Sequence, residues 1–359
     1  MAKTPPAGLV KFVDAIRFRL GALQRTLAPP PIAALDFITG MWAFQIAYAL
    51  CELGIPDRLS DHPVSAESIA TAISAPESSV YRLLRAASNI GLTREAPGRA
   101  FTSTPICKAL RTEALGSIRE FILFQGRCAW AHWGGLTDCV KTGRSAVETI
   151  HGKTPFEYFT SPEIADDFNR AMTGISAMTV DALLGAYSFA GFRTVADIGG
   201  GHGRLLGTIL KQYPALHGVL LDLPGVVAGA PRILEELGVS DRCQVREADF
   251  FQPLPPVDAD LYLMKSIIHD WADPDAVSIL RNVRAQMRND SRLALCEVVV
   301  PGPNQPSFAK YLDLEMLVHA GGKERTESEY AALFAAAGLR LVHITPTAGP
   351  MSLIEAQPV

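Results

Sequence analysis

A short run in the second half of the chain, residues 194–203, constrains the fold more than any other segment. An apolar stretch reaches Asp197, and four glycines follow at positions 199, 200, 201 and 203. This order predicts a β-strand, a tight turn and a helix, which we expect over Arg204–Gln212. Glycine allows a sharp turn and admits a ligand where a Cβ would collide. The run therefore predicts an open α/β sheet with a nucleotide-like ligand at the turn.

The spacing of these glycines distinguishes between two nucleotide-like ligands. The dinucleotide fingerprint needs a glycine three residues after Gly201, and Arg204 stands there. The observed pattern, Asp-x-Gly-Gly-Gly-x-Gly, suits a ligand with an ammonium and a sulfonium group instead. Asp222 ends the next apolar run, where it can bind a ribose diol, and Asp249-Phe250 follow a third run, where they can bind an adenine amine and pack on the base. An ordinary nucleotide-type domain with unrelated surface acids stays the alternative.

Five motifs follow one another along the chain, at residues 197–203, 222–226, 249–251, 265–271 and 321–326. Their order and spacing resemble those of the plant and bacterial small-molecule O-methyltransferases that use S-adenosylmethionine, and the resemblance covers nearly the whole chain. One departure is Ala248, where many relatives carry glycine. With the residues above, the resemblance gives an expected cofactor set of Asp197, Gly199, Gly200, Gly201, Asp222, Leu223, Asp249, Phe250, Lys265 and Ser176. The expected product is S-adenosylhomocysteine.

His269 is the expected catalytic base. It follows the buried strand predicted at 259–264, at the sheet edge where ligands bind. Methyl transfer from a sulfonium needs an oxygen nucleophile about 3 Å from the methyl carbon. Moving a proton from a phenol to a free imidazole is uphill by about 3.5 pH units, roughly 5 kcal/mol, and a carboxylate beside the ring narrows that gap. The resemblance supplies Glu297 and Glu324 for this role, whereas Asp270 is expected to point away as a sequence neighbour.

Composition and charge exclude other classes of protein. The 359 residues suit about two domains, and 48% hydrophobic residues suffice for full cores. A formal net charge of −4 shows no excess of positive charge that would attract nucleic acid or an anionic membrane. The six cysteines show no C-x-x-C pair, so we expect neither a metal site nor disulfides, and a cytoplasmic location. No apolar run reaches 18 residues, and basic residues interrupt the N-terminal one.

The first third of the chain has a helical pattern. An amphipathic helix is expected at 9–27 and a strongly apolar one at 32–53, with three prolines between them. Two short helices at 65–73 and 77–89, followed by a hairpin around Pro97-Gly98, form a winged helix-turn-helix pattern. Arg82 and Arg85 on the second short helix could touch phosphates, but two arginines favour DNA binding only weakly. The resemblance implies instead a module for homodimer formation that also covers the substrate.

Residues 121–172 are the part of the chain densest in aromatic and methionine side chains. Each of them, Phe124 and Trp133 included, is most simply a core residue, but together they predict a flat apolar pocket for an aromatic substrate. The resemblance places Phe168, Met172 and Ser176 on a helix beside the cofactor and the acceptor. It places Met316 and His319 on the opposite side of the pocket, with packing as the alternative role.

These observations together predict the fold class and the function. We expect an N-terminal all-α, winged-helix dimerisation domain at 1–110, a helical linker at 111–185 that contributes to the substrate pocket, and a Rossmann-like class I methyltransferase domain at 186–359. Strands at 339–345 and 351–356 would close the sheet, the final one antiparallel by resemblance. The expected reaction is methylation of a hydroxyl oxygen on an aromatic small molecule. The alternatives are a relative that hydroxylates or decarboxylates a polycyclic substrate, and a ligand-sensing winged-helix regulator.

Overall fold

The computed structural model describes residues 5–114 and 116–359. They form two compact units, of which one contains Arg17–Gly134 and Phe156–Met178, and the other contains the residues up to Ile16, Gly135–Pro155 and Thr179–Val359. The segment 111–185 thus contributes to both units. Three described helices contain residues of both units: α1 (Ala7–Thr26), α10 (Pro155–Phe159) and α11 (Ala165–Ala186).

The second unit is built on the expected mixed sheet. Its strand order is β10-β11-β8-β7-β4-β5-β6, and β9 (Arg325–Thr326) pairs with β8 off this path. The parallel strands are β4 (Thr194–Ile198), β5 (His217–Asp222), β6 (Cys243–Glu247), β7 (Leu261–Lys265) and β8 (Arg292–Val300). The final strand, β11 (Met351–Pro358), is antiparallel to both β8 and β10 (Leu339–Pro346), which confirms the expected closing hairpin.

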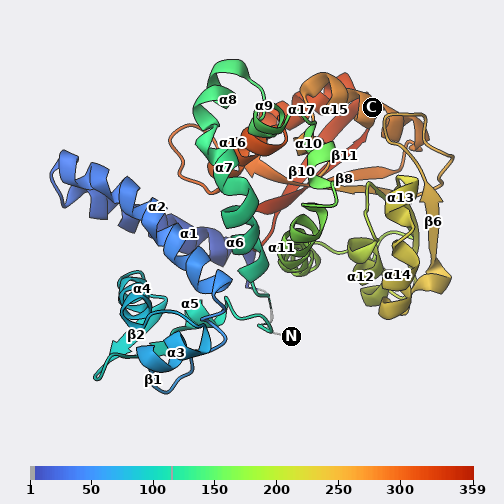
Figure 1. The fold of residues 1–359 in the computed structure, drawn as a ribbon. Coiled ribbons are helices and arrows are strands. Elements are labelled where there is room, and N and C mark those ends of the chain that lie inside the picture. Colours follow the sequence, from blue (N-terminus) through green and yellow to red (C-terminus); the bar gives the residue numbers. More distant parts are fainter. Residues whose placement is uncertain (1–4, 115) are drawn as a thin grey trace. The chain divides into compact units, whose positions relative to one another are not determined.

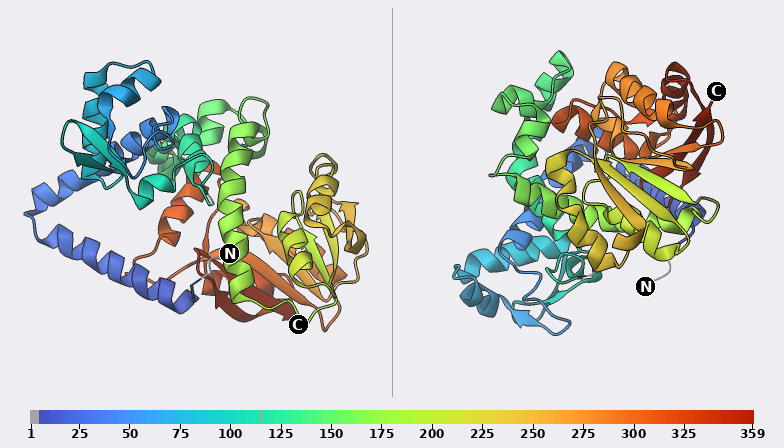
Figure 2. Two further views of the ribbon diagram at one scale, coloured as in Figure 1. Left: turned by 90° about the horizontal axis from the view of Figure 1, so that it is seen from below. Right: turned by 90° about the vertical axis from the view of Figure 1, so that its right-hand side faces the viewer.

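Helices cover both faces of this sheet (Figures 1 and 2). On one face, α12 (Arg204–Gln212), α14 (Ala230–Leu237) and the end of α11 pack on alternate strand residues such as Val195 and Leu263. On the other face, α15 (Asp273–Gln286) and α17 (Glu327–Ala336) pack on the intervening residues, such as Ala196 and Met264. Buried parallel strands have apolar side chains on both faces, and this arrangement leaves the carboxyl ends of the strands free for a site.

Shorter elements complete this unit. The helix α16 (Ala309–His319) lies against α8 (Leu136–Thr142) and α9 (Ala146–His151). The 3-10 turn η2 (Ser240–Arg242) precedes β6, and a second 3-10 turn, η3 (Ile268–Asp270), follows β7. The short helix α13 (Pro224–Val227) follows β5. All six cysteines lie in the described part of the chain and are free thiols.

The N-terminal unit has the expected winged-helix pattern. Its short helices are α3 (Ala66–Ala72) and α4 (Glu77–Asn89), and the wing is the hairpin of β2 (Thr93–Ala96) and β3 (Ala100–Ser103). The two-residue strand β1 (Val64–Ser65) pairs with β3, so the domain is helical with a small antiparallel sheet rather than all-α. Its other helices are α2 (Pro30–Glu52), α5 (Pro105–Lys108), α6 (Arg119–Phe124), the π-helix η1 (Gln125–Ala129) and α7 (Trp130–Gly134).

The helix α2 has an exposed apolar surface at its N-terminal end. Large side chains there are 43–76% exposed, among them Ile32, Leu35, Phe37, Ile38, Met41 and Trp42. Polar residues such as Asp36 and Gln45 interrupt the run, yet the helix is long and apolar enough to cross a membrane by length and composition alone. Helices that pack against another protein chain share these properties, so the finding assigns no membrane.

Candidate active site

The glycine turn after β4 has the backbone that only glycine adopts easily. Gly199, Gly201 and Gly203 have φ angles of 68°, 62° and 76°. A Cβ on Gly200 would lie 2.5 Å from the Leu220 side chain and 2.6 Å from a carboxylate oxygen of Asp197. The turn is therefore pressed against the sheet, and the N-terminus of α12 follows it directly at Arg204.

Asp222, at the end of β5, links the glycine turn after β4 to the loop after β5. Its Oδ2 accepts a hydrogen bond from the Gly201 N–H at 2.8 Å, and its Oδ1 accepts one from the Leu223 N–H at 2.8 Å. The side chain expected to bind a ribose diol thus also fixes the glycine turn to the end of the next strand. Each carboxylate oxygen keeps a further lone pair that can accept a hydrogen bond from a ligand.

Asp197 is an unpartnered acid beneath the glycine turn. It is 1% exposed, and neither carboxylate oxygen has a hydrogen-bond partner among the described residues. Burial raises the pKa of Asp197 to about 7, although Lys265 on the neighbouring strand β7 lowers it. A buried carboxylate is costly without a partner, so this position suits a ligand that brings a positive charge or a donor.

Asp249 and Phe250 follow β6, as the sequence predicts. The Asp249 carboxylate accepts a hydrogen bond from the Phe251 N–H at 2.9 Å, and this bond shapes the loop. The Phe250 ring lies close to the glycine turn, 3.5 Å from where a Cβ of Gly199 would be. Phe250 and Phe251 also contact Trp271, with ring centroids 6.1 and 4.7 Å from the indole. An aromatic wall therefore flanks the turn, on the side where a planar base could pack.

His269 lies in η3 between three carboxylates. Its Nδ1 is 2.9 Å from Glu324 Oε1 and 3.6 Å from Glu297 Oε2, while its Nε2 is 3.6 Å from Asp270 Oδ1. The structure thus brings together the three residues expected from the resemblance. The expectation that Asp270 points away was wrong, because the rule for adjacent residues applies to regular helices and η3 is a three-residue turn.

The charges around His269 change its basicity. Burial by itself lowers the pKa of the imidazole, but the nearby Glu297 carboxylate, the hydrogen bond that the ring donates to Glu324 and the Asp270 carboxylate raise it to about 10. Burial raises the pKa of Glu297 above its usual range, although His269 lowers it. This arrangement stabilises an imidazolium.

The backbone after β7 holds Glu297 in place. The Ile267 and Ile268 N–H groups both donate to Glu297 Oε1, each at 2.9 Å. Ser266, immediately before them, has a φ of 55°, a left-handed conformation that is costly for a residue other than glycine. This turn aims two successive N–H groups at one buried carboxylate. Sequence reasoning missed the role of Ser266, because nothing in its residue type indicates a left-handed backbone.

A clamp from the segment that carries Glu324 fixes the η3 turn from the other side. The fully buried Arg325 donates to the carbonyls of Ile268 and Trp271 at 2.9 and 2.8 Å. It also donates to Asp273 Oδ1 at 3.1 Å through Nε. These carbonyls flank His269 on both sides, so Arg325 positions the imidazole without touching it. The sequence motif at 321–326 held this signal, but the arginine was given no role there.

Gly322 also lies against the η3 turn, at a distance that only glycine allows. The Lys323 N–H donates to the His269 carbonyl at 2.9 Å. A Cβ on Gly322 would lie 2.0 Å from that carbonyl oxygen, so no larger residue fits without a backbone shift. Gly322 therefore allows the segment with Glu324 to reach Nδ1 of His269.

The expected substrate residues lie in both units. Phe124, Trp133, Phe168 and Met172 belong to one aromatic cluster of the N-terminal unit, in which Phe124 is 4% exposed. Phe124 is therefore a core residue, as the packing alternative predicts. Trp133, Phe168 and Met172 are only partly buried, as is Ser176 on α11. Met316 and His319 lie on α16 in the other unit, where the buried His319 has its Nδ1 3.4 Å from Glu315. Their contact with a ligand stays a prediction.

The distances at His269 would also allow a metal ion. Ligand atoms of His269, Glu297 and Glu324 all lie within 4.8 Å of one another. Nδ1 and Glu324 already share a hydrogen bond, which a metal would have to displace. The absence of a metal cofactor stays an expectation.

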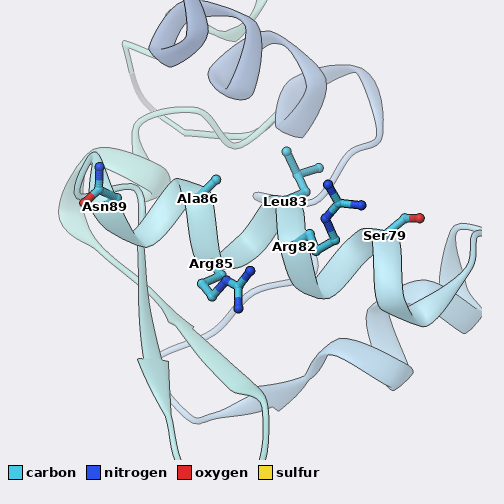
Figure 3. Close-up of a pocket in the computed structure, with 6 residues that line it drawn as sticks. All are labelled: Ser79, Arg82, Leu83, Arg85, Ala86 and Asn89. Atoms are coloured by element: carbon cyan, nitrogen blue, oxygen red, sulfur yellow. The ribbon is translucent and has the colours of Figure 1, made fainter. Parts of the chain in front are cut away.

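The outer face of α4 forms a groove, lined by Ser79, Arg82, Leu83, Arg85, Ala86 and Asn89 (Figure 3). This is the helix on which a winged-helix DNA reader would place its contacts. Arg85 and Arg99 lie over the Tyr81 ring, at 5.3 and 4.0 Å, and Arg99 is 3.3 Å from Glu77. The Glu77 carboxylate beside Arg99 weakens the attraction of that arginine for phosphate. The expectation of no nucleic-acid partner remains a prediction.

Two family models match the chain. Residues 133–340 match the O-methyltransferase domain, and residues 35–113 match the O-methyltransferase dimerisation domain. The phenazine O-methyltransferase of Lysobacter antibioticus is 38% identical over 326 residues, which cover 90% of this chain and 95% of that protein.

Solved structures agree with these matches. The mitomycin 7-O-methyltransferase has a TM-score of 0.82 at 33% identity, covering 92% of this chain and 98% of that one. The human N-acetylserotonin methyltransferase, solved with S-adenosylmethionine, has a TM-score of 0.81 at 25% identity, with coverage of 92% and 98%. The likeness extends over both the helical part and the sheet.

Proposed function

Because the chain belongs to the S-adenosylmethionine-dependent O-methyltransferases, we propose that it methylates a hydroxyl oxygen of an aromatic small molecule, with His269 as the general base. The observation that carries this proposal is the imidazole whose Nδ1 lies 2.9 Å from Glu324 and 3.6 Å from Glu297. Nδ1 is thereby bound on the buried side, and Nε2 is the nitrogen left to meet an acceptor hydroxyl. Glu297 and Glu324 act through the ring as positioning residues.

The residues at the strand ends fit the cofactor. The unpartnered carboxylate of Asp197 suits the ammonium group, and the glycine turn leaves the space that a Cβ would fill. Asp222 suits the ribose diol, and Asp249 with Phe250 suits the adenine. When bound, S-adenosylmethionine supplies the electrophilic methyl group. The chain aligns the acceptor oxygen and removes its proton.

The basicity of His269 supports this role. A pKa of about 10 matches that of an ordinary phenol, so once the ring has lost its own proton, transfer of the phenol proton to it is no longer uphill. The buried carboxylates that raise it need no movement during the reaction. Hydroxylation or decarboxylation by a repurposed relative needs no such base, and the arrangement does not favour either.

An aromatic acceptor is supported by two observations. The names of a 38% identical phenazine O-methyltransferase and of the N-acetylserotonin methyltransferase point to aromatic substrates for those proteins. In this chain, the partly buried rings and methionine of the N-terminal cluster could line an apolar pocket. A screen of phenolic compounds with the methyl donor tests the proposal directly. Each methylation adds about 14 Da by mass spectrometry, and no transfer to any hydroxyl would refute the assignment.

Asp222→Ala is expected to weaken cofactor binding by about 1.5–3 kcal/mol, because the diol loses a charged acceptor. The same change frees the Gly201 N–H, so the effect should fall at the upper end of that range. Isothermal titration with S-adenosylhomocysteine measures it, with Asp241→Ala in η2 as an exposed control. Affinity equal to the wild type would place the diol elsewhere, and competition by NAD would contradict the cofactor assignment.

We also propose that two chains form a homodimer. The dimerisation-domain match covers 35–113, and the exposed apolar side chains of α2 would be buried by a second copy. Sedimentation should give about twice 38.7 kDa at micromolar concentration. Deleting residues 1–31 should reduce both association and activity if the first helix contributes to the partner's pocket. A fully active monomer would contradict this proposal. We expect a cytoplasmic protein without a membrane partner.

A further inference from the structure

His269 is held by buried charges on one side only. Glu297 and Glu324 have side chains 0% and 2% exposed, and each keeps one buried oxygen without a hydrogen-bond partner among the described residues. Two such carboxylates against one nitrogen require a compensating charge, which the proton on the ring supplies. With the proton the three groups carry a net charge of −1, and without it −2.

Other titratable groups face this cluster. Asp270, 45% exposed, lies near Nε2 in the same turn. Asp313 on α16 accepts a hydrogen bond from the Glu324 N–H at 3.0 Å, and Tyr330 on α17 lies near Glu297. Asp313 and Asp270 add negative charge, so they also favour the proton on His269. The fully buried Arg325 guanidinium, bound to the Ile268 and Trp271 carbonyls, is the other positive group beside this turn, and it opposes the acids.

The reaction itself brings a second positive charge to this place. An in-line transfer needs the acceptor oxygen about 3 Å from the methyl carbon and within hydrogen-bond reach of the base. The sulfonium must then lie within about 8 Å of the imidazole. Two positive charges at that separation repel each other enough to shift an equilibrium roughly 5- to 30-fold at the effective dielectric constants of protein sites. The product carries a neutral thioether and lacks this repulsion.

We infer that the cluster of His269, Glu297 and Glu324 distinguishes the charged methyl donor from its neutral product through the proton on His269. Donor binding makes loss of this proton roughly 5- to 30-fold more favourable, so a fraction of the proton is released to the solvent, whereas product binding retains it. The inference rests on the proposed function, because it assumes that donor and base share one site. Donor binding makes the unprotonated ring more abundant, and the base more available, when the methyl group is present.

The sign of the pH dependence follows. Because the positive ligand lowers the pKa of His269 below its value of about 10 in the free protein, proton release is greatest between the two values. In that range the affinity for the donor increases as the pH rises, whereas the affinity for the product does not increase through His269. Asp197 also titrates, near pH 7, but it faces the part that both ligands share. Its effect therefore cancels in the ratio of the two affinities.

Calorimetric titration tests this inference without turnover. S-adenosylhomocysteine and S-adenosylmethionine, whose sulfonium keeps its charge at every pH, are titrated without an acceptor from pH 7 to 10 in buffers of different ionisation enthalpy. We expect proton release with S-adenosylmethionine but not with S-adenosylhomocysteine, and a ratio of their affinities that changes roughly 5- to 30-fold in favour of S-adenosylmethionine with rising pH. His269→Gln should abolish both effects, while His217→Gln, an exposed histidine at the start of β5, should retain them.

The outcomes separate the two proposals. If both ligands bind with the same pH dependence in the wild type, or if His269→Gln leaves the difference intact, the inference is wrong and the proposed function stands. If neither ligand binds, the proposed function fails. Should His269→Gln not fold, as judged by its thermal unfolding, Glu324→Gln serves instead, and it should move the pH range of proton release to lower pH by lowering the pKa of the ring.

Discussion

Replacing His269 with alanine is expected to lower kcat by about 10²–10⁴ and to leave product binding nearly unchanged. General-base catalysis contributes on that scale, and in the proposed function the imidazole meets the acceptor while the strand ends hold the cofactor. The loss should shrink as the acidity of the acceptor rises, because a phenol that is already ionised needs no base. Steady-state kinetics over a series of phenols measures this dependence.

The two carboxylates around the ring provide the matched comparison. Glu297→Gln and Glu324→Gln should each cost less than His269→Ala, because both act through the imidazole. Their combined effect should be non-additive, since they support one group. If His269→Ala methylates a weakly acidic phenol at the wild-type rate, alignment of the reactants alone carries the reaction and the assignment of the base is wrong.

Gly322→Ala is expected to lower kcat by about 10²-fold although it adds only one methyl group. Its Cβ would lie 2.0 Å from the His269 carbonyl oxygen, so the backbone of one segment must move. The move breaks the Lys323 hydrogen bond to His269 and takes Glu324 away from Nδ1. A displacement of about 1 Å in a catalytic group can cost this much. The kcat of Gly322→Ala should fall, while its affinity for S-adenosylhomocysteine should equal that of the wild type.

Gly321→Ala is the control for this substitution. Gly321 has a φ of 71° but open space where its Cβ would be, so alanine there costs about 1 kcal/mol of stability through backbone strain. The neighbouring substitution should therefore lower the melting temperature with little effect on kcat. Equal kcat values for the Gly322→Ala enzyme and the wild type would show that the close approach does not position Glu324.

The elements that position the site were largely predictable. Residues 77–89 and 204–212 form helices with the expected bounds, and the apolar runs before Asp197 and Asp222 form neighbouring parallel strands. These elements depend on local periodicity and on glycine, which a single sequence displays. The predicted third strand and the closing antiparallel hairpin are likewise confirmed. The added strand β1 was not predicted, because two residues carry no periodicity.

The residues of the site were predicted more fully than their geometry. The sequence by itself determined the strand, turn and helix around Gly199, and the resemblance of its motifs pointed to His269 with Glu297 and Glu324. Only the tertiary structure decided that Asp270 turns back toward the ring, that Ser266 aims two N–H groups at Glu297, and that Arg325 and Gly322 fix the η3 turn. These contacts join segments up to 57 residues apart. Local patterns record backbone preference, whereas side-chain distance and pKa depend on which strand ends the sheet brings together.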